Sequence, residues 1–459
     1  MNLSRRCFLG GVVSLAAFDS LGAAKGHSLG GAPRLKIGVV SDVHIALGNN
    51  GKLMPDNTEV YFENALKWYR EQEVDVIMAT GDLADCGTRV ELEAMMGAWN
   101  RVFPNNRGKN GRKVEKVFIT GNHDWEGWKY GPKGKTRTEI SFPDPEEYNR
   151  QVLRKDMAKR WEEITGEKYE KIFLKKIKGY TFIGYHWEDS SFRDLPAFME
   201  KHAGEIDKTK PFFYGQHAHL KDTCFGPWAW GHCSGVTTEC LKKFPNCVAF
   251  SGHAHYCSTD ERAIWQDGFT SIGLPSLRYA GVEGDEFKGT ELRYRNKHKI
   301  CPAWGMQSGL LVSVYDDAIV YQKRDFSGGM TIGDDWVQPI GRGADKKAFS
   351  FEKRAQLFEA PQFPPDAKIE VKEGNNIVIP ACIPDKRARC FRYELEVITP
   401  EGEKKVHNLY PLGWGRAEAH SWVKTASMYE YDPKEIDIAK PMKLTPINCF
   451  GKRGKPISN

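Results

Sequence analysis

The chain has little that would place it in a specialised class of protein. Of its 459 residues, 40% are hydrophobic and 27% are charged, and it contains neither an internal repeat nor a low-complexity tract, so its composition gives no sign of disorder. The formal net charge is only +6 at pH 7. A charge this small predicts neither nucleic acid nor an anionic membrane surface as a stable partner, and the length suffices for roughly two or three domains.

Beyond the first two dozen residues, no stretch is apolar enough to span a bilayer. The N-terminus, with Arg5-Arg6 followed by a short apolar run and small residues up to Ala24, resembles a bacterial twin-arginine export signal. The alternative is a chance arginine pair before a membrane anchor, but the run is shorter than the ~20 residues that a spanning helix needs. We expect residues 1–24 to be an export signal and residues 25–34 a leader. The mature chain is then periplasmic or in the cell envelope, with no membrane span.

No two cysteines have the CxxC spacing of a structural zinc site. Eleven cysteines are present, and ten remain when Cys7 of the signal is set aside. An even number in an exported protein suggests disulfides, but the twin-arginine route carries folded proteins, so the chain must fold in a reducing cytoplasm. We expect mostly free, buried thiols. The best candidates for any bridge are Cys224, Cys233, Cys240, Cys247 and Cys257.

Short β-branched runs alternate with amphipathic segments in the first part of the chain. The run Leu35 to Val40 predicts a buried strand, residues 56–72 an amphipathic helix, and the alternation continues to a strand at 116–120. Strand, helix and strand in this order predict an α/β unit with a buried sheet. Later segments predict a helix over residues 145–163 and, after the apolar run at 247–251, mostly strands.

A second domain is expected at the C-terminus. Residues 358–365 are rich in proline and predict a hinge between domains. Beyond it, alternating polar and apolar stretches predict about seven short strands. We therefore divide the mature chain into a catalytic domain over residues 35–357 and a small β-sandwich of immunoglobulin or fibronectin type over residues 366–459.

Five strand-like runs end in polar residues of the kind that bind metals. These are Asp42-Val43-His44, Gly81-Asp82, Gly121-Asn122-His123-Asp124, His217, and Gly252-His253-Ala254-His255. Each pattern is common by chance, and a single histidine is usually a hydrogen-bonded structural residue. Together, mixed oxygen and nitrogen ligands favour Mn, Fe, Co or Zn over Ca or Mg. Two such ions about 3.5 to 4 Å apart can hold a hydroxide for attack and clamp the oxygens of a phosphoryl group.

The same motifs, in this order, resemble the signature of the calcineurin-like metallophosphoesterases over roughly residues 35–326. The resemblance implies a four-layer αββα sandwich with two mixed sheets and a centre of two divalent transition-metal ions. It implies that Asp42, His44 and His255 bind one ion and that Asn122, His217 and His253 bind the other. The carboxylate of Asp82 would bridge the two ions.

The resemblance also implies catalytic roles for two neighbouring residues. His123 is similar to the family residue that contacts the phosphate and protonates the leaving group, and Asp124 would orient it. His219 is a second candidate for the position of His217, which we favour because it lies closest to the apolar run. The aromatic and basic segment 125–135 is either a substrate rim or an exposed loop.

Two relatives within the superfamily fit less well. Purple acid phosphatases have a tyrosine three residues after the bridging aspartate, where this chain has Asp85, so a tyrosine-bound ferric centre is not expected. Secreted 5′-nucleotidases have a larger C-terminal substrate domain. We therefore expect hydrolysis of a phosphomonoester or phosphodiester by metal-bound hydroxide in the cell envelope. The alternative is an exported binding protein that keeps the scaffold without turnover, and the oligomeric state is left open.

Overall fold

The computed structural model describes residues 31–48, 50–54, 58–131, 134–226, 229, 231–281 and 306–459. The predicted export signal and most of the predicted leader lie outside these residues, as does Cys301. Among the helices of the described residues, none is both long and apolar enough to cross a membrane.

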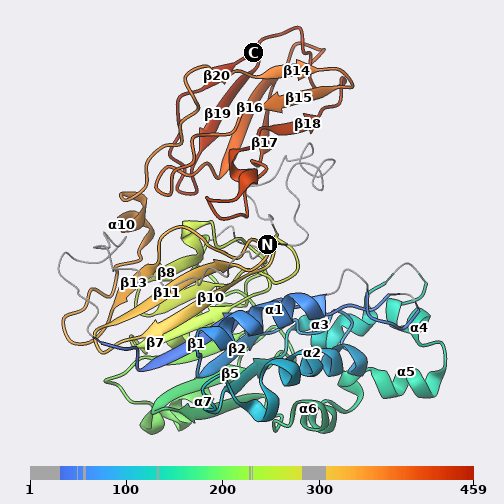
Figure 1. Ribbon diagram of the computed structural model, residues 1–459, viewed down its shortest axis with the longest axis vertical. Helices are drawn as coiled ribbons and strands as arrows, with labels where there is room; N and C mark the ends of the chain where they lie inside the picture. The colour runs from blue at the N-terminus through green and yellow to red at the C-terminus, as the bar shows by residue number, and fades with distance from the viewer. Residues whose placement is uncertain are drawn as a thin grey trace, which may run out of the picture.

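Two mixed sheets form the centre of the first part of the chain (Figure 1). The first sheet has the order β12 (Met330–Thr331), β11 (Ala318–Asp325), β10 (Ser308–Val314), β1 (Leu35–Val40), β2 (Val76–Thr80) and β3 (Glu115–Ile119), with β13 (Trp336–Pro339) paired to β11. The second has the order β4 (Ile172–Ile177), β5 (Tyr180–Tyr185), β6 (Phe212–Gln216), β7 (Cys247–Ser251), β9 (Thr270–Gly273) and β8 (Ile264–Gln266). In the first sheet β1, β2 and β3 are parallel to one another, and the remaining pairs are antiparallel. In the second sheet the central pairs are parallel and the two outer pairs antiparallel.

The alternation of side chains along each strand divides the core into layers. On β2, Val76 and Met78 lie in the cluster between the two sheets, whereas Ile77 and Ala79 pack on the other face. On β7, Val248 joins the same central cluster. Because successive strand residues point to opposite faces, strands that are apolar throughout must be covered on both sides.

Helices cover both outer faces. The first sheet is covered by α1 (Thr58–Glu71), α2 (Arg89–Val102) and α6 (Met157–Thr165), and the second by α7 (Leu195–Lys201) and α8 (Val236–Leu241). This confirms the predicted four-layer αββα sandwich. Shorter elements connect these layers: α3 (Asn122–Glu126), α4 (Arg137–Ser141), α5 (Pro145–Gln151), η1 (Pro104–Asn106), η2 (Gly127–Lys129), η3 (Leu153–Asp156), η4 (Ala203–Glu205) and η5 (Glu261–Ala263).

The helix predicted over residues 145–163 is interrupted. It forms α5, a 3-10 turn and α6, because the residues between the two helices bond to the segment before α2. Val152 makes an isolated β-bridge with Thr88, and the Leu153 amide donates to the Gly87 carbonyl at 2.9 Å. These long-range bonds replace hydrogen bonds within a helix. The periodicity of apolar residues in the sequence does not predict such bonds.

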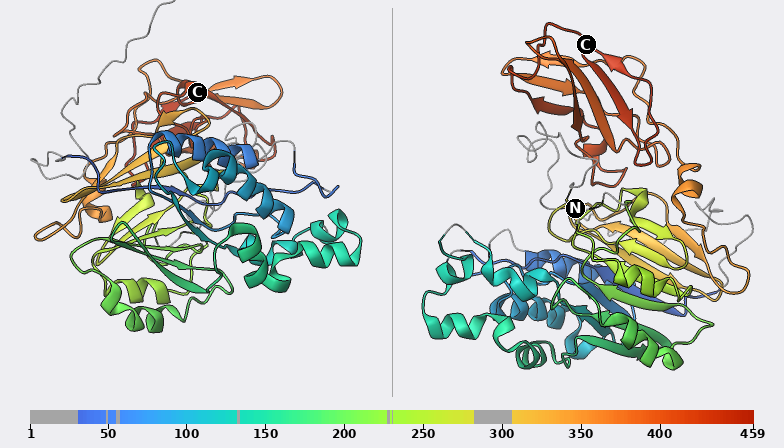
Figure 2. Two further views of the ribbon diagram at one scale, coloured as in Figure 1. Left: turned by 60° about the horizontal axis from the view of Figure 1, so that its bottom comes forward. Right: turned by 180° about the vertical axis from the view of Figure 1, so that it is seen from behind.

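A β-sandwich follows at the C-terminus, drawn in orange and red in Figure 2. One sheet contains β14 (Glu370–Lys372), β15 (Asn376–Ile379) and β18 (Ser427–Glu430), and the other β17 (Lys404–Leu409), β16 (Arg392–Ile398), β19 (Lys443–Ile447) and β20 (Ile457–Ser458). A 3-10 turn, η7 (Ser421–Lys424), precedes β18. Alternating residues such as Tyr393, Leu395 and Val397 form the core of this sandwich, as the sequence pattern predicts.

The two parts of the chain are packed against each other. The helix α10 (Phe351–Ala355) leads into residues 358–365, where the Glu359 amide donates to the Arg387 carbonyl at 2.7 Å and its carbonyl accepts from Asn448 at 2.9 Å. A separate apolar cluster spans the contact, with Cys257 and Met306 from the first part and Phe391, Tyr410, Trp414 and Cys449 from the sandwich. The proline-rich segment is thus bonded in place between two packed units.

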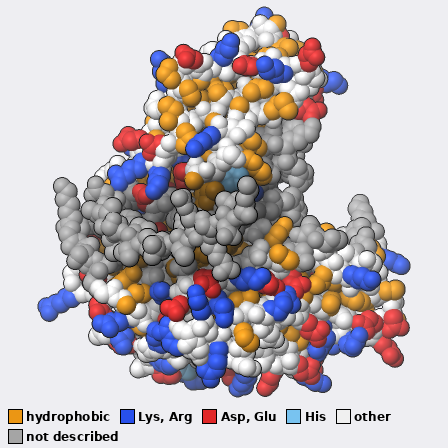
Figure 3. Space-filling view, viewed as in Figure 1, with side chains coloured by type: hydrophobic (Ala, Val, Ile, Leu, Met, Phe, Trp, Pro, Cys, Tyr) orange, Lys and Arg blue, Asp and Glu red, His pale blue; other side chains and the backbone are white. Residues whose placement is uncertain are grey.

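The outer surface carries charges of both signs. In Figure 3, basic and acidic side chains are interspersed over the lower part of the molecule, and no single-signed patch dominates that face. The same view shows hydrophobic side chains on the sandwich. Exposed large hydrophobic residues of the sandwich include Val371, Ile383, Val406, Met428 and Ile438. The mixed surface agrees with the small net charge.

Candidate metal centre

The predicted ligand residues follow the carboxyl ends of strands from both sheets. Asp42 and His44 come after β1, Asp82 after β2, and His217 after β6. Asn122 begins α3 directly after β3, while His253 and His255 follow β7. The pairs β1–β2, β2–β3 and β6–β7 are parallel, so their carboxyl ends lie at one edge of each sheet. This is the edge at which α/β sheets hold their ligands.

The backbone at this edge adopts an unusual conformation. Five ligand residues have left-handed φ angles: Asp42 (53°), His44 (48°), Asp82 (49°), His253 (70°) and His255 (55°). Residues other than glycine adopt this region rarely, and such strain clusters at functional sites. The sharp turn after each strand directs the side chain back across the sheet edge toward the others.

Two glycines leave the room that these side chains need. Gly81 has a φ of 104°, and a Cβ there would lie 2.5 Å from Nδ1 of His217. A Cβ on Gly252 would overlap the Ser41 hydroxyl and the Asp42 carboxylate. Any larger residue at either position would displace a predicted ligand.

One group of ligand atoms consists of Asp42, His44, Asp82 and His255, all within 4.8 Å of one another. Nε2 of His255 lies 2.8 Å from Oδ1 of Asp42, and Nε2 of His44 lies 3.6 Å from Oδ2 of Asp82. All four residues are buried. Carboxylate oxygens and imidazole nitrogens thus converge on one point that is shielded from water.

A second group consists of Asp82, His217 and His253, again within 4.8 Å. Nε2 of His217 lies 3.0 Å from Oδ2 of Asp82. Oδ1 of Asn122 is buried and makes no hydrogen bond in the described structure, while its Nδ2 donates to the Tyr130 hydroxyl at 3.2 Å. The Asp82 carboxylate belongs to both groups, as a bridging ligand would.

His219 lies apart from both groups. Its Nε2 contacts the Cys224 carbonyl at 3.1 Å, and the residue forms an isolated β-bridge with His232. Between the two histidines that the sequence left open, the structure brings only His217 to the ligand groups.

The charges of the cluster are strongly coupled. Burial opposes ionisation of Asp42 and Asp82, but the histidines beside them outweigh it and hold the pKa of each carboxyl below its usual value. Burial also opposes a charge on His217, yet the Asp82 carboxylate raises its pKa to about 9. For His44 and His253, burial and neighbouring histidines lower the pKa to about 4 and about 3. The last two are therefore neutral at pH 7, the form that binds a metal.

His123 lies at the edge of the cluster, with its side chain 22% exposed. Its ring packs edge-on against His44 and Tyr130, with centroids 4.6 and 4.7 Å apart. Its Nδ1 lies 2.7 Å from the Asp85 carbonyl oxygen, which fixes a proton on that nitrogen and leaves Nε2 for another partner.

The predicted support of His123 by Asp124 is wrong. The Asp124 carboxylate accepts backbone amides of Leu83 at 3.1 Å, Ala84 at 2.7 Å and Gly121 at 2.7 Å. Neighbouring residues at the start of a helix point in different directions, so Asp124 faces the turn after β2 while His123 faces the site. Asp124 therefore holds the backbone around Asp82.

Asp85 takes the supporting role and was missed as a functional residue. Its Oδ1 lies 3.1 Å from Nδ1 of His44 and 3.0 Å from the Arg278 guanidinium, and Oδ2 pairs with Arg137. Burial opposes its ionisation, but His44, Arg278 and His123 hold the pKa of the Asp85 carboxyl far below its usual value. A signal was present, since Asp85 is a carboxylate three residues after Asp82. His44, Asp85 and His123 form a further group of possible ligands, but both oxygens of Asp85 already have partners.

The donor set fits two transition-metal ions. Each group offers at least one carboxylate and two imidazoles, a mixture suited to Mn, Fe, Co or Zn. The Asn122 Oδ1 is buried without a hydrogen bond in the described structure, and an atom buried in this way needs a partner.

Two ligand groups that share one carboxylate, at the strand ends of an αββα fold, define a two-metal hydrolase. Residues 35–257 match the family model described as calcineurin-like phosphoesterase. This part of the chain therefore belongs to that family of metal-dependent phosphoester hydrolases, and the matched segment contains every predicted ligand residue.

The comparisons with individual proteins give distant relatives only. None of the curated proteins matches the chain. The chain is similar to the solved structure of a dimetal phosphatase from Danio rerio, with 12% identity, 66% of this chain and 98% of that chain covered, and a TM-score of 0.40. It is also similar to the purple acid phosphatase PPD1 from yellow lupin, Lupinus luteus, with 13% identity, coverage of 70% and 55%, and a TM-score of 0.39. A third similar structure is that of PhoD, with 11% identity, coverage of 71% and 73%, and a TM-score of 0.40.

Proposed function

We propose that the protein hydrolyses a phosphomonoester or phosphodiester at a centre of two divalent transition-metal ions. The observation that carries this proposal is the sharing of Asp82 between two groups of ligand atoms. A shared carboxylate with nitrogen and oxygen donors on both sides is the arrangement that holds two ions close enough to act on one phosphoryl group.

The groups support a division of the ligands between the two ions. Asp42, His44 and His255 would hold one ion, Asn122, His217 and His253 the other, and Asp82 would bridge them. When bound, such ions lower the pKa of a water molecule and offset the charge that develops on the phosphoryl oxygens. Mn, Fe, Zn and Co all suit these donors.

The protein contributes a proton donor and a rigid frame. The His123 side chain is 22% exposed, and its Nδ1–H donates to the Asp85 carbonyl, so we expect Nε2 to face the substrate. From there it can bind a phosphoryl oxygen and protonate the leaving group. Asp85 holds His44 through Nδ1, which keeps Nε2 of His44 directed at the first ion.

The decisive experiment combines metal analysis with turnover. Full-length protein folded in the cytoplasm is expected to contain two metal ions per chain, and to hydrolyse an aryl phosphomonoester or a bis-aryl phosphodiester when supplied with Mn or Fe. Asp82→Asn should lose both metal and turnover. Asp75→Asn is the matched control, because Asp75 is also a buried carboxylate but pairs with Lys178 at 3.0 Å, away from the ligand groups.

The outcome that contradicts the proposal is equally concrete. If Asp82→Asn keeps the metal content and activity of the unaltered protein, the shared carboxylate does not organise the site. Loss of even one ligand would favour the alternative of a binding protein without turnover. The two groups contain six of the predicted ligand residues, which supports an enzyme.

We further propose that this hydrolysis takes place in the cell envelope after twin-arginine export. The support is Arg5-Arg6 followed by a short apolar run and small residues up to Ala24. Replacing both arginines with lysine should keep the protein in the cytoplasmic fraction, whereas the unaltered chain should be found in the periplasmic or envelope fraction. Equal distribution of the two would argue against the signal.

A further inference from the structure

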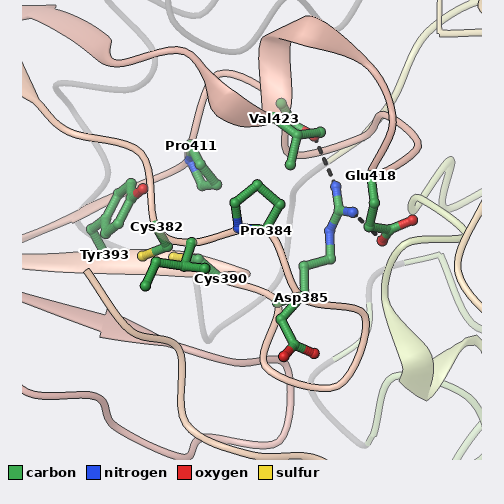
Figure 4. A pocket seen from close by; sticks show the side chains of 11 residues that line it. Cys382, Pro384, Asp385, Cys390, Tyr393, Pro411, Glu418 and Val423 are labelled. Atoms are coloured by element: carbon green, nitrogen blue, oxygen red, sulfur yellow. Dashed lines mark hydrogen bonds and ion pairs between the residues drawn. The ribbon is translucent and has the colours of Figure 1, made fainter. Parts of the chain in front are cut away.

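Two cysteine side chains face each other in the C-terminal β-sandwich. Cys382 follows β15 of one sheet and Cys390 precedes β16 of the other. Both line the same pocket, and Figure 4 shows their sulfur atoms side by side next to Tyr393. Both residues are buried, at 8% exposed for Cys382 and 7% for Cys390, and they lie at the lining of this pocket. Neither cysteine belongs to the group that the sequence favoured for a bridge.

The two thiols are within hydrogen-bonding contact. Burial, and then the hydrogen bond between the two side chains, raises the pKa of the Cys390 thiol well above its ordinary value. The Cys390 sulfur also lies 3.3 Å from the Arg392 carbonyl oxygen. Cys382 and Cys390 lie next to strands of the two sheets, β15 and β16, with their sulfurs side by side.

Cys224 is in a different environment. Its thiol donates to the carbonyls of Ala263 and Ser271, each at 3.2 Å. Like Cys382 and Cys390, Cys224 is buried and free. Cys382 and Cys390 differ from Cys224 in that each has a thiol as its neighbour in an open pocket.

The segment between the two cysteines contacts the catalytic part of the chain. We call residues 383–389 the docking loop. Lys386 pairs with Asp334 at 2.8 Å, and the Arg387 carbonyl accepts the Glu359 amide at 2.7 Å. Arg389 pairs with Glu418 and donates to the Arg416 carbonyl at 2.7 Å. The loop thus bonds to both sides of the contact between the two parts.

We propose that Cys382 and Cys390 form an intramolecular disulfide when the folded chain meets a disulfide oxidant, and that this bond closes the docking loop. The thiolate of one cysteine attacks a sulfur of the oxidant and releases one thiol. The second cysteine then attacks the mixed disulfide, forms the bond between Cys382 and Cys390 and releases the second thiol. The two cysteines lose two electrons and two protons, which the oxidant gains as it becomes two thiols.

The bond changes how the docking loop moves. In the reduced chain the loop is held at its ends by strands and along its length by ion pairs, which are weak where they are exposed. A covalent link between its ends removes open conformations of the loop. The closed loop then holds the two parts of the chain in one relative position. It does so through its bonds to Glu359 and Asp334.

The sequence supplies a direct assay. Trypsin cleaves after Lys386, Arg387 and Arg389, so Cys382 and Cys390 fall on different peptides unless a disulfide joins them. Full-length reduced protein is first treated with glutathione disulfide in its folded state. It is then unfolded in the presence of a reagent that blocks the remaining thiols, and digested with trypsin without reductant. Mass spectrometry is expected to show the two peptides joined, with the loss of two hydrogen atoms.

Matched variants and a second measurement complete the test. Cys382→Ser and Cys390→Ser should each abolish the joined peptides, while Cys224→Ser should leave them unchanged. Hydrogen exchange of residues 383–389 should be slower in the oxidised protein than in the reduced protein. The proposal is overturned if the folded, unaltered chain gives no joined peptides, keeps glutathione on either cysteine, or joins either cysteine to a different one. Equal exchange in both forms would refute the closure of the loop.

Discussion

At the scale of single residues, Asn122 and His123 are neighbours in one short motif but have different proposed roles. Asn122 has a buried Oδ1 that makes no hydrogen bond in the described structure, whereas the His123 side chain is 22% exposed. Both follow the end of β3, but they start a helix and so point in different directions. In the proposed function Asn122 binds a metal ion and His123 acts on the substrate.

We expect separable effects from replacing these two residues. Asn122→Ala should lower the metal content by one ion, because the amide oxygen is lost as a ligand. His123→Ala should keep both ions and lower kcat by roughly 10²- to 10⁴-fold, most for substrates with poor leaving groups. Metal analysis and steady-state kinetics on the same preparations check this, with the exposed Asn110→Ala as control. Full metal content and activity in both variants would contradict the assignment.

Tyr130 sets the orientation of the Asn122 amide. Its hydroxyl accepts from Nδ2 of Asn122 at 3.2 Å, which leaves Oδ1 free for the proposed metal ion. Tyr130→Phe keeps the ring against His123 but removes this bond, worth about 0.5–1.5 kcal/mol, so the affinity of the second ion should fall roughly 2- to 10-fold. Chelator competition measures the affinity, and kcat at saturating metal should change little. Tyr148→Phe on α5 is the control, and an equal loss in it would exclude a specific role for the Tyr130 hydroxyl.

At the scale of elements, the ends of the parallel strands explain why so much of the site was predictable. A strand is visible in sequence as an apolar run, and the ligands come directly after five such runs, so their convergence follows from the sheet topology. The fold class follows from this pattern. Six of the predicted ligand residues also lie in the two groups, namely Asp42, His44, Asp82, His217, His253 and His255. The features that the sequence did not predict depend on the direction in which a side chain points and on contacts between residues far apart in the chain. Asp124 turns toward the backbone around Asp82, Asp85 reaches His44, and Val152 breaks a predicted helix to bridge Thr88.

His186 joins the two sheets near this edge and makes stability depend on pH. Its Nδ1 accepts the Thr120 amide at 3.0 Å, and burial, together with Lys175, lowers the pKa of His186 to about 3. Its unfolded pKa is about 6.5, so the unfolded chain binds more protons between these values. The contribution to stability is complete above about pH 6.5 and is lost as the pH falls toward 3.

His186→Asn should reduce this dependence, because the amide oxygen can accept from Thr120 without titrating. Between pH 7.5 and pH 5, the free energy of unfolding of the unaltered protein should fall by about 2 kcal/mol more than that of the variant. Urea unfolding at both pH values measures the difference. The same fall in both proteins would show that His186 does not carry the effect.

At the scale of the whole molecule, the contact between the two parts has an apolar centre and a polar rim. Trp414 is 2% exposed and lies with Phe391 and Tyr410 against Cys257 and Met306. Ion pairs such as that of Lys386 surround this centre. Buried apolar area outweighs exposed ion pairs in energy, so the parts are held together mainly by the centre.

Two variants test this division. Trp414→Ala should lower the free energy of unfolding by about 3–5 kcal/mol and separate the unfolding of the two parts into distinct transitions. Lys386→Ala should change it by less than about 1 kcal/mol and keep the transition unchanged. Denaturant unfolding followed by tryptophan fluorescence reports both. The idea of an apolar centre fails if the lysine variant is the more damaging one.

The left-handed backbone of the ligand residues also sets a trade-off between durability and function. Asp42, Asp82 and His253 hold conformations that glycine adopts without penalty and that cost other residues roughly 1–2 kcal/mol each. A variant of this protein that is not selected for hydrolysis gains stability when these three residues are replaced by glycine. The same replacements remove the metal ligands. Engineering for heat resistance that scores stability alone will therefore select against catalysis at these positions first.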